Sequence, residues 1–466
     1  MLVLACVHGA FAQVPAKFVT WDVVALDAHG EPVLDLQPSQ IHLTDNRHPQ
    51  SLVFWHSDQR HPDAPSVTVV VLDISYAPVK GVRWNEAVRT LRQLESSTYL
   101  YLYVKTARNF LLPIHELSAI DAESPPANSP WIEKTVPPLE ATLRFEPPDN
   151  TNTMTSFTMY MDLAARLAAF PGRKSIVCIG CLFAQAEDWK AGPTPTAAQV
   201  DRAVELRQVT EAFHEARVAV YHVSGQPVSG RIGPGSGAGL GFPNGGVDDR
   251  CDLRGGIAEV TGGRCYTAGQ IEDAIRQAIR DDSSSYRLAY LPPAENWDGK
   301  MHKISLTSTR AGVHLLTTRW YQADKLDDIT GERRAPIPDI AITSPLDQSD
   351  IAVLVSTPHR VQGTVPLQIR VFAEDLLLLP RNGRYSGSLA LQVICYTPDE
   401  RRQACTEPAT VRLDLSEQQY QSALRDGLRF PAEVPIDAAP SRLRVIVHDV
   451  NSGSTGSATV QLNEDR

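Results

Sequence analysis

The sequence lacks an excess of positive charge. Its 44 lysine and arginine residues are outnumbered by 54 aspartate and glutamate residues, which gives a formal net charge of -10. A nucleic-acid-binding surface needs a basic stripe that neutralises phosphates. The composition therefore argues against nucleic acid as a partner.

Long apolar runs are also missing. None reaches the roughly 18 residues that a membrane-spanning helix needs, so no transmembrane span is expected. At the amino terminus, Leu2–Val7 is a short apolar run, and Ala10 and Ala12 are small residues that suit a signal-peptidase site. We interpret residues 1–12 as the tail of an export signal whose start was assigned too late. The alternative is a frayed terminal strand.

Common catalytic motifs are absent. The chain contains no G-x-S-x-G and no H-E-x-x-H. A glycine-rich segment at 225–246 matches neither the dinucleotide-binding pattern nor the phosphate-binding loop, and a surface loop is the simplest interpretation. The sequence therefore does not predict an enzyme.

Cysteine is sparse, with seven residues, of which Cys6 would leave with the signal. Export would permit disulfides among the other six. Three pairs lie close in sequence and are the disulfide candidates: Cys178 with Cys181, Cys251 with Cys265, and Cys395 with Cys405. The first pair also has the spacing of a redox motif. However, it lies at a strand end, whereas reactive pairs usually open a helix.

What the sequence does have is a series of buried strands that alternate with helices. A chain of 466 residues is too long for one ordinary core, so two to four domains are expected. Strands are predicted near 67–72, 98–104, 109–114, 175–179 and 218–223, and helices near 82–95, 155–170, 196–216, 253–261 and 270–281. Residues 120–150 are rich in proline and polar residues and are predicted to be a long loop. This alternation predicts a mostly parallel sheet with helices on both faces at about 60–283.

The flanks of this region have strand patterns instead. Strands at 18–58 need partners, and those at 284–322 are the obvious candidates, which predicts one shared β unit. Residues 323–339 are predicted to be a linker. Seven short strands and no convincing helix follow at 340–463, which predicts an immunoglobulin-like β-sandwich. The apolar run at 376–379 is either a core strand or part of an interface patch.

Several segments resemble the acidobacterial von Willebrand factor A-related domain proteins. The most specific is GGIAEVTGGRCYTAGQIEDAIRQAIRDDSSSYRLAYLPPAENWDGKMHKI at 255–304. Pro171-Gly172-Arg173-Lys174, VALDAHGEPVLDLQPSQIHLTDN at 24–46 and RLRVIVHDVNSGSTGS at 442–457 add to it. The resemblance covers nearly the whole chain. It implies an α/β, von Willebrand factor A-like, Rossmann-type doubly wound sheet, an exported or cell-envelope location, and an adhesion or scaffold role.

The resemblance also suggests where a metal ion would bind. Ligand-binding A-domains often hold Mg²⁺ with Asp-x-Ser-x-Ser after the first strand, a threonine from a second loop, and an aspartate after the fourth strand. Here Asp73 and Ser75 fit, Ala77 does not, and Thr153 or Thr155 is the candidate threonine. The fourth strand ends in Gly180-Cys181 instead of an aspartate. We therefore expect a degenerate site, with the alternative that Asp73 caps the following segment or accepts backbone hydrogen bonds.

These patterns favour an exported binding module that contacts a protein partner at the carboxyl ends of the sheet strands. The surface would comprise 73–78, 150–156, 181–184 and 225–246. Its named residues are Tyr76, Asn152, Cys181, Gly237 and Gly239. Two alternatives stay open, namely a thiol-redox protein that uses Cys178 and Cys181 and a purely structural envelope protein.

Overall fold

The computed structural model describes most of the chain. The described residues are 18–57, 67–74, 81–94, 99–106, 110–115, 131–143, 157–170, 172–181, 197–223, 257–267, 269–323, 337–343, 346–357, 364–397, 401–435 and 442–462. They form three parts, each with its own hydrophobic core.

The first part contains a six-stranded sheet with the order β10-β9-β8-β5-β6-β7. Neighbouring strands are parallel from β10 to β6, whereas β7 is antiparallel to β6. The strands are β5 (Val67–Asp73), β6 (Tyr99–Lys105), β7 (Leu111–His115), β8 (Lys174–Ile179), β9 (Val218–Val223) and β10 (Cys265–Tyr266). Both β5 and β8 are buried along their whole length, as expected for apolar strands covered on two faces.

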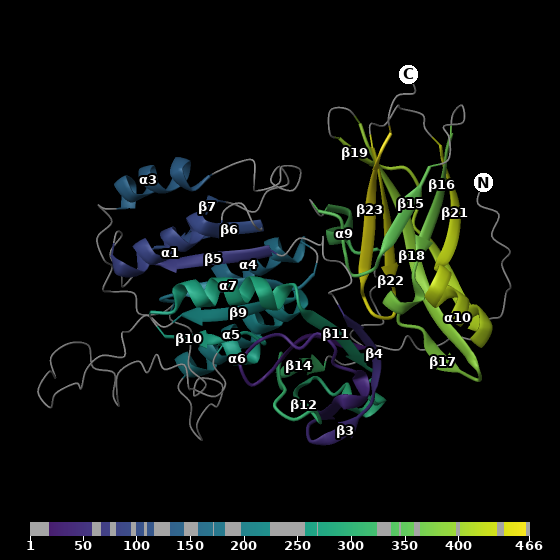
Figure 1. Ribbon diagram of the computed structural model, residues 1–466, viewed down its shortest axis with the longest axis horizontal. Coiled ribbons are helices and arrows are strands. Elements are labelled where there is room, and N and C mark those ends of the chain that lie inside the picture. The colour runs from purple at the N-terminus through teal and green to yellow at the C-terminus, as the bar shows by residue number, and fades with distance from the viewer. Residues whose placement is uncertain are drawn as a thin grey trace, which may run out of the picture.

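Helices lie on both faces of this sheet (Figure 1). Those that pack with Val69 and Val71 on one face are α4 (Thr158–Ala168), α5 (Ala197–Glu215) and α6 (Ile257–Val260). Those that pack with Val70 and Leu72 on the other face are α1 (Val82–Leu94), α3 (Ile132–Leu143) and α7 (Ile271–Asp282). Alternate residues of one strand therefore belong to two separate cores.

The second part joins strands from two distant stretches of sequence. Its sheets have the orders β13-β1-β11-β4 and β14-β12-β2-β3. The strands are β1 (Val19–Leu26), β2 (Ile41–Asp45), β3 (His48–Gln50), β4 (Leu52–Ser57), β11 (Ser285–Tyr290), β12 (Lys300–Ser308), β13 (His314–Thr317) and β14 (Trp320–Ala323). All the pairs are antiparallel, and Trp21, Leu288 and Tyr321 lie in the core between the sheets.

The third part is also antiparallel. One sheet has the order β15-β16-β21, and the other places β17, β19, β20 and β22 against the long strand β18, with β23 beyond β22. The strands are β15 (Val353–Ser356), β16 (Thr364–Val371), β17 (Leu379–Arg381), β18 (Arg384–Tyr396), β19 (Arg402–Ala404), β20 (Ala409–Ser416), β21 (Leu428–Pro435), β22 (Arg442–Asp449) and β23 (Thr455–Gln461). Two helices accompany them, α9 (Asp339–Thr343) and α10 (Glu417–Asp426).

The expected fold class, a Rossmann-type doubly wound α/β fold, is wrong for this chain. Strands make up 47% of the structure and helices 28%, and most strands are antiparallel. The physical reason is that the strands outside 60–283 pair antiparallel, either with the next strand in a hairpin or with a strand from a distant segment of the chain. Even the six-stranded sheet ends in an antiparallel strand, because the short connection from β6 to β7 cannot form a crossover.

Two helices also contradict the sequence-based predictions. The segment expected to be a long loop contains α3, which has Pro137 and Pro138 inside it. The region expected to have no helix contains α10, which begins at a capping box between Ser416 and Gln419 and ends at Gly427 with φ of 74°. The capping box and the terminal glycine are sequence signals that could have identified α10.

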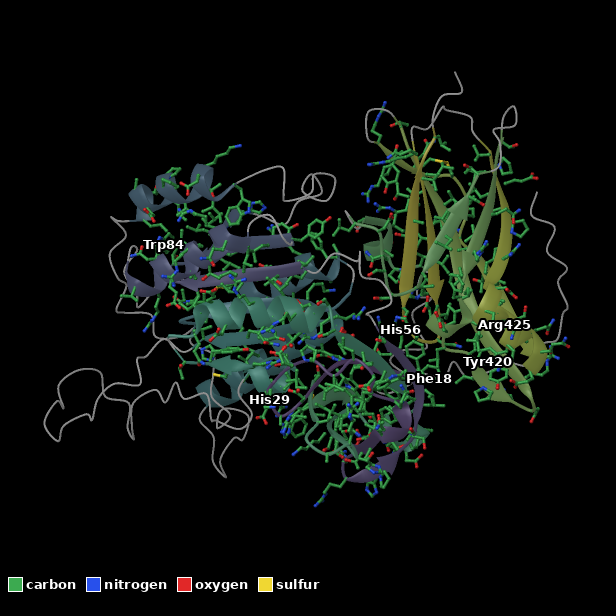
Figure 2. The ribbon with its side chains drawn as sticks, in the orientation of Figure 1. Phe18, His29, His56, Trp84, Tyr420 and Arg425 are labelled. Carbon is green, nitrogen blue, oxygen red and sulfur yellow. A yellow bond between two sulfur atoms is a disulfide. The ribbon has the colours of Figure 1, made fainter. Side chains whose placement is uncertain are left out.

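The second and third parts are joined by a buried contact. Leu377 packs with Phe54 and Ala289 of the second part, whereas Leu376 and Leu378 belong to the core of the third part. Beside this contact, His56 Nδ1 of β4 lies 3.3 Å from Asp375 Oδ1. Figure 2 shows His56 near the carboxyl-terminal strands, whereas Trp84 of α1 lies at the opposite end of the molecule.

A glycine turn at 262–263 packs the first part against the second. Gly262 has a φ of 77°, and an added Cβ would lie 2.9 Å from the Thr317 backbone. At Gly263 an added Cβ would lie 2.0 Å from the Val220 carbonyl oxygen. Only glycine fits this approach of a turn to β9 without backbone movement.

We therefore expect Gly263→Ala to lower the free energy of unfolding by roughly 1–3 kcal/mol, since overpacking forces the backbone apart. Gly269→Ala is the matched control, because its added Cβ meets nothing within 4 Å. The control should change stability by less than about 0.5 kcal/mol. Urea denaturation measures both, and equal stability of the two variants would contradict the packing argument.

Candidate functional site

The carboxyl ends of the parallel strands hold a buried ion pair where the sequence suggested a metal site. Asp73 ends β5, and Lys105 is its register partner at the end of β6. Lys105 Nζ lies 2.9 Å from Asp73 Oδ2, and both side chains are almost fully buried. The Ile74 N–H also donates to the Lys105 carbonyl at 2.9 Å. An ammonium group therefore already neutralises the Asp73 carboxylate.

This arrangement does not fit a divalent cation. Mg²⁺ needs several oxygen ligands, and the carboxylate that would supply the charge is engaged by Lys105. Within the described ranges, no group of three or more His, Cys, Asp or Glu side chains could hold a metal. The other expected ligands, Ser75, Thr153 and Thr155, lie outside the described residues. Sequence analysis missed Lys105, although it directly follows an apolar strand.

The expected binding surface is described only in part. Tyr76, Asn152, Gly237 and Gly239 lie outside the described residues. Cys181 is described and has 0% exposure, so its side chain does not reach the surface. Its carbonyl oxygen lies 2.9 Å from His222 Nε2.

The residues that the structure describes contain two of the three expected disulfides. Cys178 is bridged to Cys181, and Cys395 to Cys405. The first bridge connects the end of β8 to the residue after Gly180, which has a φ of 75°. The second links β18 to the segment after β19. Cys251 lies outside the described residues, so its pairing with Cys265 stays a prediction.

A cavity of about 390 Å³ lies at the opposite, amino ends of the parallel strands. Its walls include Lys174 and Val218, the first residues of β8 and β9. The second part contributes residues of β1, β11, β12 and β14, and the third part contributes residues from before β15 and from the β22–β23 turn. We call it the junction cavity, because all three parts line it.

Charged side chains bind the three parts together at the junction cavity. We call Asp22, Lys174, Arg217, Arg287 and Asp350 the junction cluster. Arg217 donates to both carboxylate oxygens of Asp22, at 2.9 and 2.6 Å, and also to Asp350. Arg287 Nη1 donates to the other oxygen of Asp350 at 2.7 Å. Each aspartate therefore shares at least one guanidinium with another part of the fold.

The local electrostatics follow from burial and from these pairs. Burial alone would raise the pKa of Asp350, but Arg217 and Arg287 hold it well below its ordinary value. The pKa of Asp22 is likewise lowered, because the same two guanidinium groups outweigh burial. Both carboxylates are thus ionised at neutral pH, and removal of Asp350 would leave the buried Arg287 without the carboxylate to which it donates.

Lys174 is the lysine of the cluster and lies at the start of β8. It is 2% exposed, and its Nζ donates to the Phe170 carbonyl at the end of α4 at 2.9 Å. Burial, followed by the charge of Arg217, lowers the pKa of Lys174 to about 7, although Asp350 and Asp22 act in the opposite direction. Burial also lowers the pKa of the neighbouring His214. The charge of Lys174 therefore changes near neutral pH.

Two further networks of polar side chains connect elements of the fold. Arg173 pairs with Asp282 and donates to the Tyr221 hydroxyl at 3.2 Å and to the Gly262 carbonyl at 3.1 Å. Ser175 Oγ donates to the same carboxylate at 2.7 Å. These contacts join the start of β8 to the end of α7 and to the glycine turn.

The second network surrounds Asp45 at the end of β2. Its carboxylate accepts hydrogen bonds from the Tyr321 hydroxyl at 2.9 Å and from Asn296 Nδ2 at 2.7 Å, and it also contacts Tyr290. His302 Nδ1 lies 2.9 Å from the same carboxylate. His302, which lies in the 255–304 segment that carried the resemblance, therefore supports the core of the second part.

The chain was compared with protein-family models and with curated proteins, and neither comparison gave a match. The resemblance seen in the sequence stays a prediction. In the part of the chain that the structure describes, no helix is long and apolar enough to cross a membrane.

We expect Lys105→Met to lower the free energy of unfolding by about 3–5 kcal/mol, because it leaves the Asp73 carboxylate buried without its cation. Replacing both residues, as Asp73→Asn with Lys105→Met, should recover part of that loss. Urea denaturation of the single and double variants measures the coupling. The exposed pair of Lys300 and Asp298 supplies the control, since Lys300→Met should cost less than about 0.5 kcal/mol.

Calorimetry with Mg²⁺ is the complementary measurement for the same pair. Wild-type protein should show no Mg²⁺ binding that depends on Asp73. Submillimolar binding that disappears in Asp73→Ala would contradict the interpretation of Asp73 and Lys105 as a closed pair.

A second expectation concerns pH. The folded pKa of Lys174, about 7, lies below its ordinary value of 10.5, so between these values the unfolded chain binds a proton that the folded chain does not. The free energy of unfolding should therefore rise from about pH 7 to about pH 10, by at most about 1.4 kcal/mol per pH unit from this group. Urea denaturation across this range tests it. Lys174→Met should remove the rise and Lys300→Met should keep it, whereas a rise that persists in Lys174→Met would assign it to another group.

Proposed function

We propose that this protein is an extracytoplasmic binding module that contacts a protein partner without a metal ion. The observation that carries the proposal lies at the carboxyl edge of the six-stranded sheet. There Lys105 forms an ion pair with Asp73, which is the one carboxylate among the described residues that was expected to bind a metal. Directly beside it, the Thr106 N–H donates to the Phe110 carbonyl at 2.9 Å, and Phe110 is 61% exposed. A large exposed aromatic next to an electrically neutral pair suits protein contact better than metal chemistry.

Three structural features support this proposal. Trp84, near the start of the helix α1 that follows β5, lies at the end of the first part that faces away from the third part (Figure 2). The junction cluster holds the three parts together, which makes the chain a preformed scaffold for that edge. The disulfides at Cys178 and Cys395 are compatible with an oxidising compartment, where such bonds persist.

The thiol-redox alternative finds little support in the geometry. Cys178 and Cys181 are both fully buried, and the Tyr160 hydroxyl lies 3.6 Å from the Cys178 sulfur. A reactive pair needs an accessible sulfur in an electropositive setting. A purely structural envelope protein is the other alternative, and the partner experiment separates it from a binding module.

The experiment uses the full chain as bait in chemical crosslinking with an envelope fraction of the source organism. Phe110→Glu places a charge on the proposed surface. Leu354→Glu is the matched control, because Leu354 is 51% exposed on β15 of the third part. We expect wild type and Leu354→Glu to retain the same partner, Phe110→Glu to weaken its binding about tenfold or more, and EDTA to have no effect.

Three outcomes would contradict the proposal. Unchanged partner binding by Phe110→Glu would exclude this edge as the contact surface. Release of the partner by EDTA would show that a metal takes part. Absence of any crosslinked partner would favour the purely structural alternative.

A further inference from the structure

The junction cavity has the size and the lining of a small-molecule site. Its volume of about 390 Å³ lies within the range of known ligand pockets, roughly 300–1,000 Å³. It lies at the opposite edge of the sheet from the proposed protein-binding surface, so a ligand here would serve a separate purpose. Contributions from all three parts give it walls of different chemistry.

One wall carries the charged side chains of the junction cluster. The junction cluster holds three cations and two carboxylates, Asp22 and Asp350, while Glu211 and Glu215 of α5 also line the cavity. The guanidinium of Arg217 is used by both carboxylates, and Arg287 is paired with Asp350. Lys174 is the cation of the cluster whose side chain donates to a backbone carbonyl instead of a carboxylate.

Lys174 also retains unused hydrogen-bonding capacity. An ammonium group has three N–H donors, and that of Lys174 donates to one acceptor, the Phe170 carbonyl. A buried cation with unused donors is costly unless another group accepts them. A ligand anion in the cavity would supply a further acceptor for this ammonium group.

Another wall is apolar and aromatic. Trp297, Met301 and Trp320 line the cavity from the second part, and Trp297 is almost fully buried. These side chains suit a ring or a short apolar group. A doubly charged anion such as phosphate fits less well, because Asp22 and Asp350 would repel its second charge.

We propose that the junction cavity binds a small organic monocarboxylate, whose carboxylate accepts hydrogen bonds from Lys174 and whose apolar part lies against Trp297, Met301 and Trp320. Binding favours the protonated form of Lys174, so the ligand binds together with a proton above neutral pH. Other charged or titratable groups that line the cavity are His214, Arg207, Glu211 and Glu215 on α5, and Arg173, which is paired with Asp282.

The test is isothermal titration calorimetry of the full chain with phenylacetate and with its neutral isostere phenylacetamide. At about pH 6 the acid should bind at least about tenfold more tightly than the amide. At about pH 8, titrations in buffers of different ionisation enthalpy should show proton uptake on binding, because Lys174 has a pKa near 7. Lys174→Met should lose both the affinity and the proton uptake, whereas the exposed control Lys300→Met should keep both.

A second variant keeps the proposal testable if Lys174→Met does not fold. Trp320→Ala removes part of the apolar wall and should weaken phenylacetate binding while leaving acetate binding unchanged. The proposal is overturned if the wild-type protein does not bind phenylacetate at millimolar concentration. It is equally overturned if the acid and the amide bind alike, or if binding survives in Lys174→Met.

Discussion

The position of Arg217 between Asp22 and Asp350 is the interaction on which the arrangement of the three parts depends. Arg217 occupies the turn from α5 to β9 and has a φ of 55°, an uncommon conformation for a residue other than glycine. From there its guanidinium contacts β1 of the second part and the segment before β15 of the third part. Arg287 doubles the link to Asp350. Because these charges are largely removed from water, each is stable only while its partners stay in place.

This constraint separates the two ends of the six-stranded sheet. The amino ends of the parallel strands are covered by the second and third parts, which creates the junction cavity with Lys174 in its wall. The carboxyl ends of these strands face away from the second and third parts, and there Lys105 neutralises the Asp73 carboxylate. Ligand sites in parallel sheets are usually expected at the carboxyl ends, so the amino-end cavity is the less expected of the two. It exists because other parts of the chain return to that edge.

Local sequence signals predicted many individual elements. The apolar runs correspond to β5, β8 and β9, and helical periodicity located α1, α4 and α7 close to their observed bounds. The signals failed where local composition conflicts with tertiary packing. Pro137 and Pro138 suggested a loop, yet α3 buries Ile132, Val136 and Leu143 against the sheet. In the candidate site, Asp73 was recognised from its motif, whereas Lys105 was missed because strand pairing alone brings it to the carboxylate.

The sequence by itself determined which segments are buried strands and which cysteines lie close together along the chain. These properties depend on neighbours along the chain, on side-chain branching and on backbone sterics. The fold class, the Asp73–Lys105 pair and the junction cluster were decided only by the tertiary structure. Asp22 and Arg217 are 195 positions apart, and Arg217 and Asp350 are 133 apart. No local pattern encodes such pairs, since burial of one charge is tolerated only after folding has brought its distant partner within hydrogen-bonding distance.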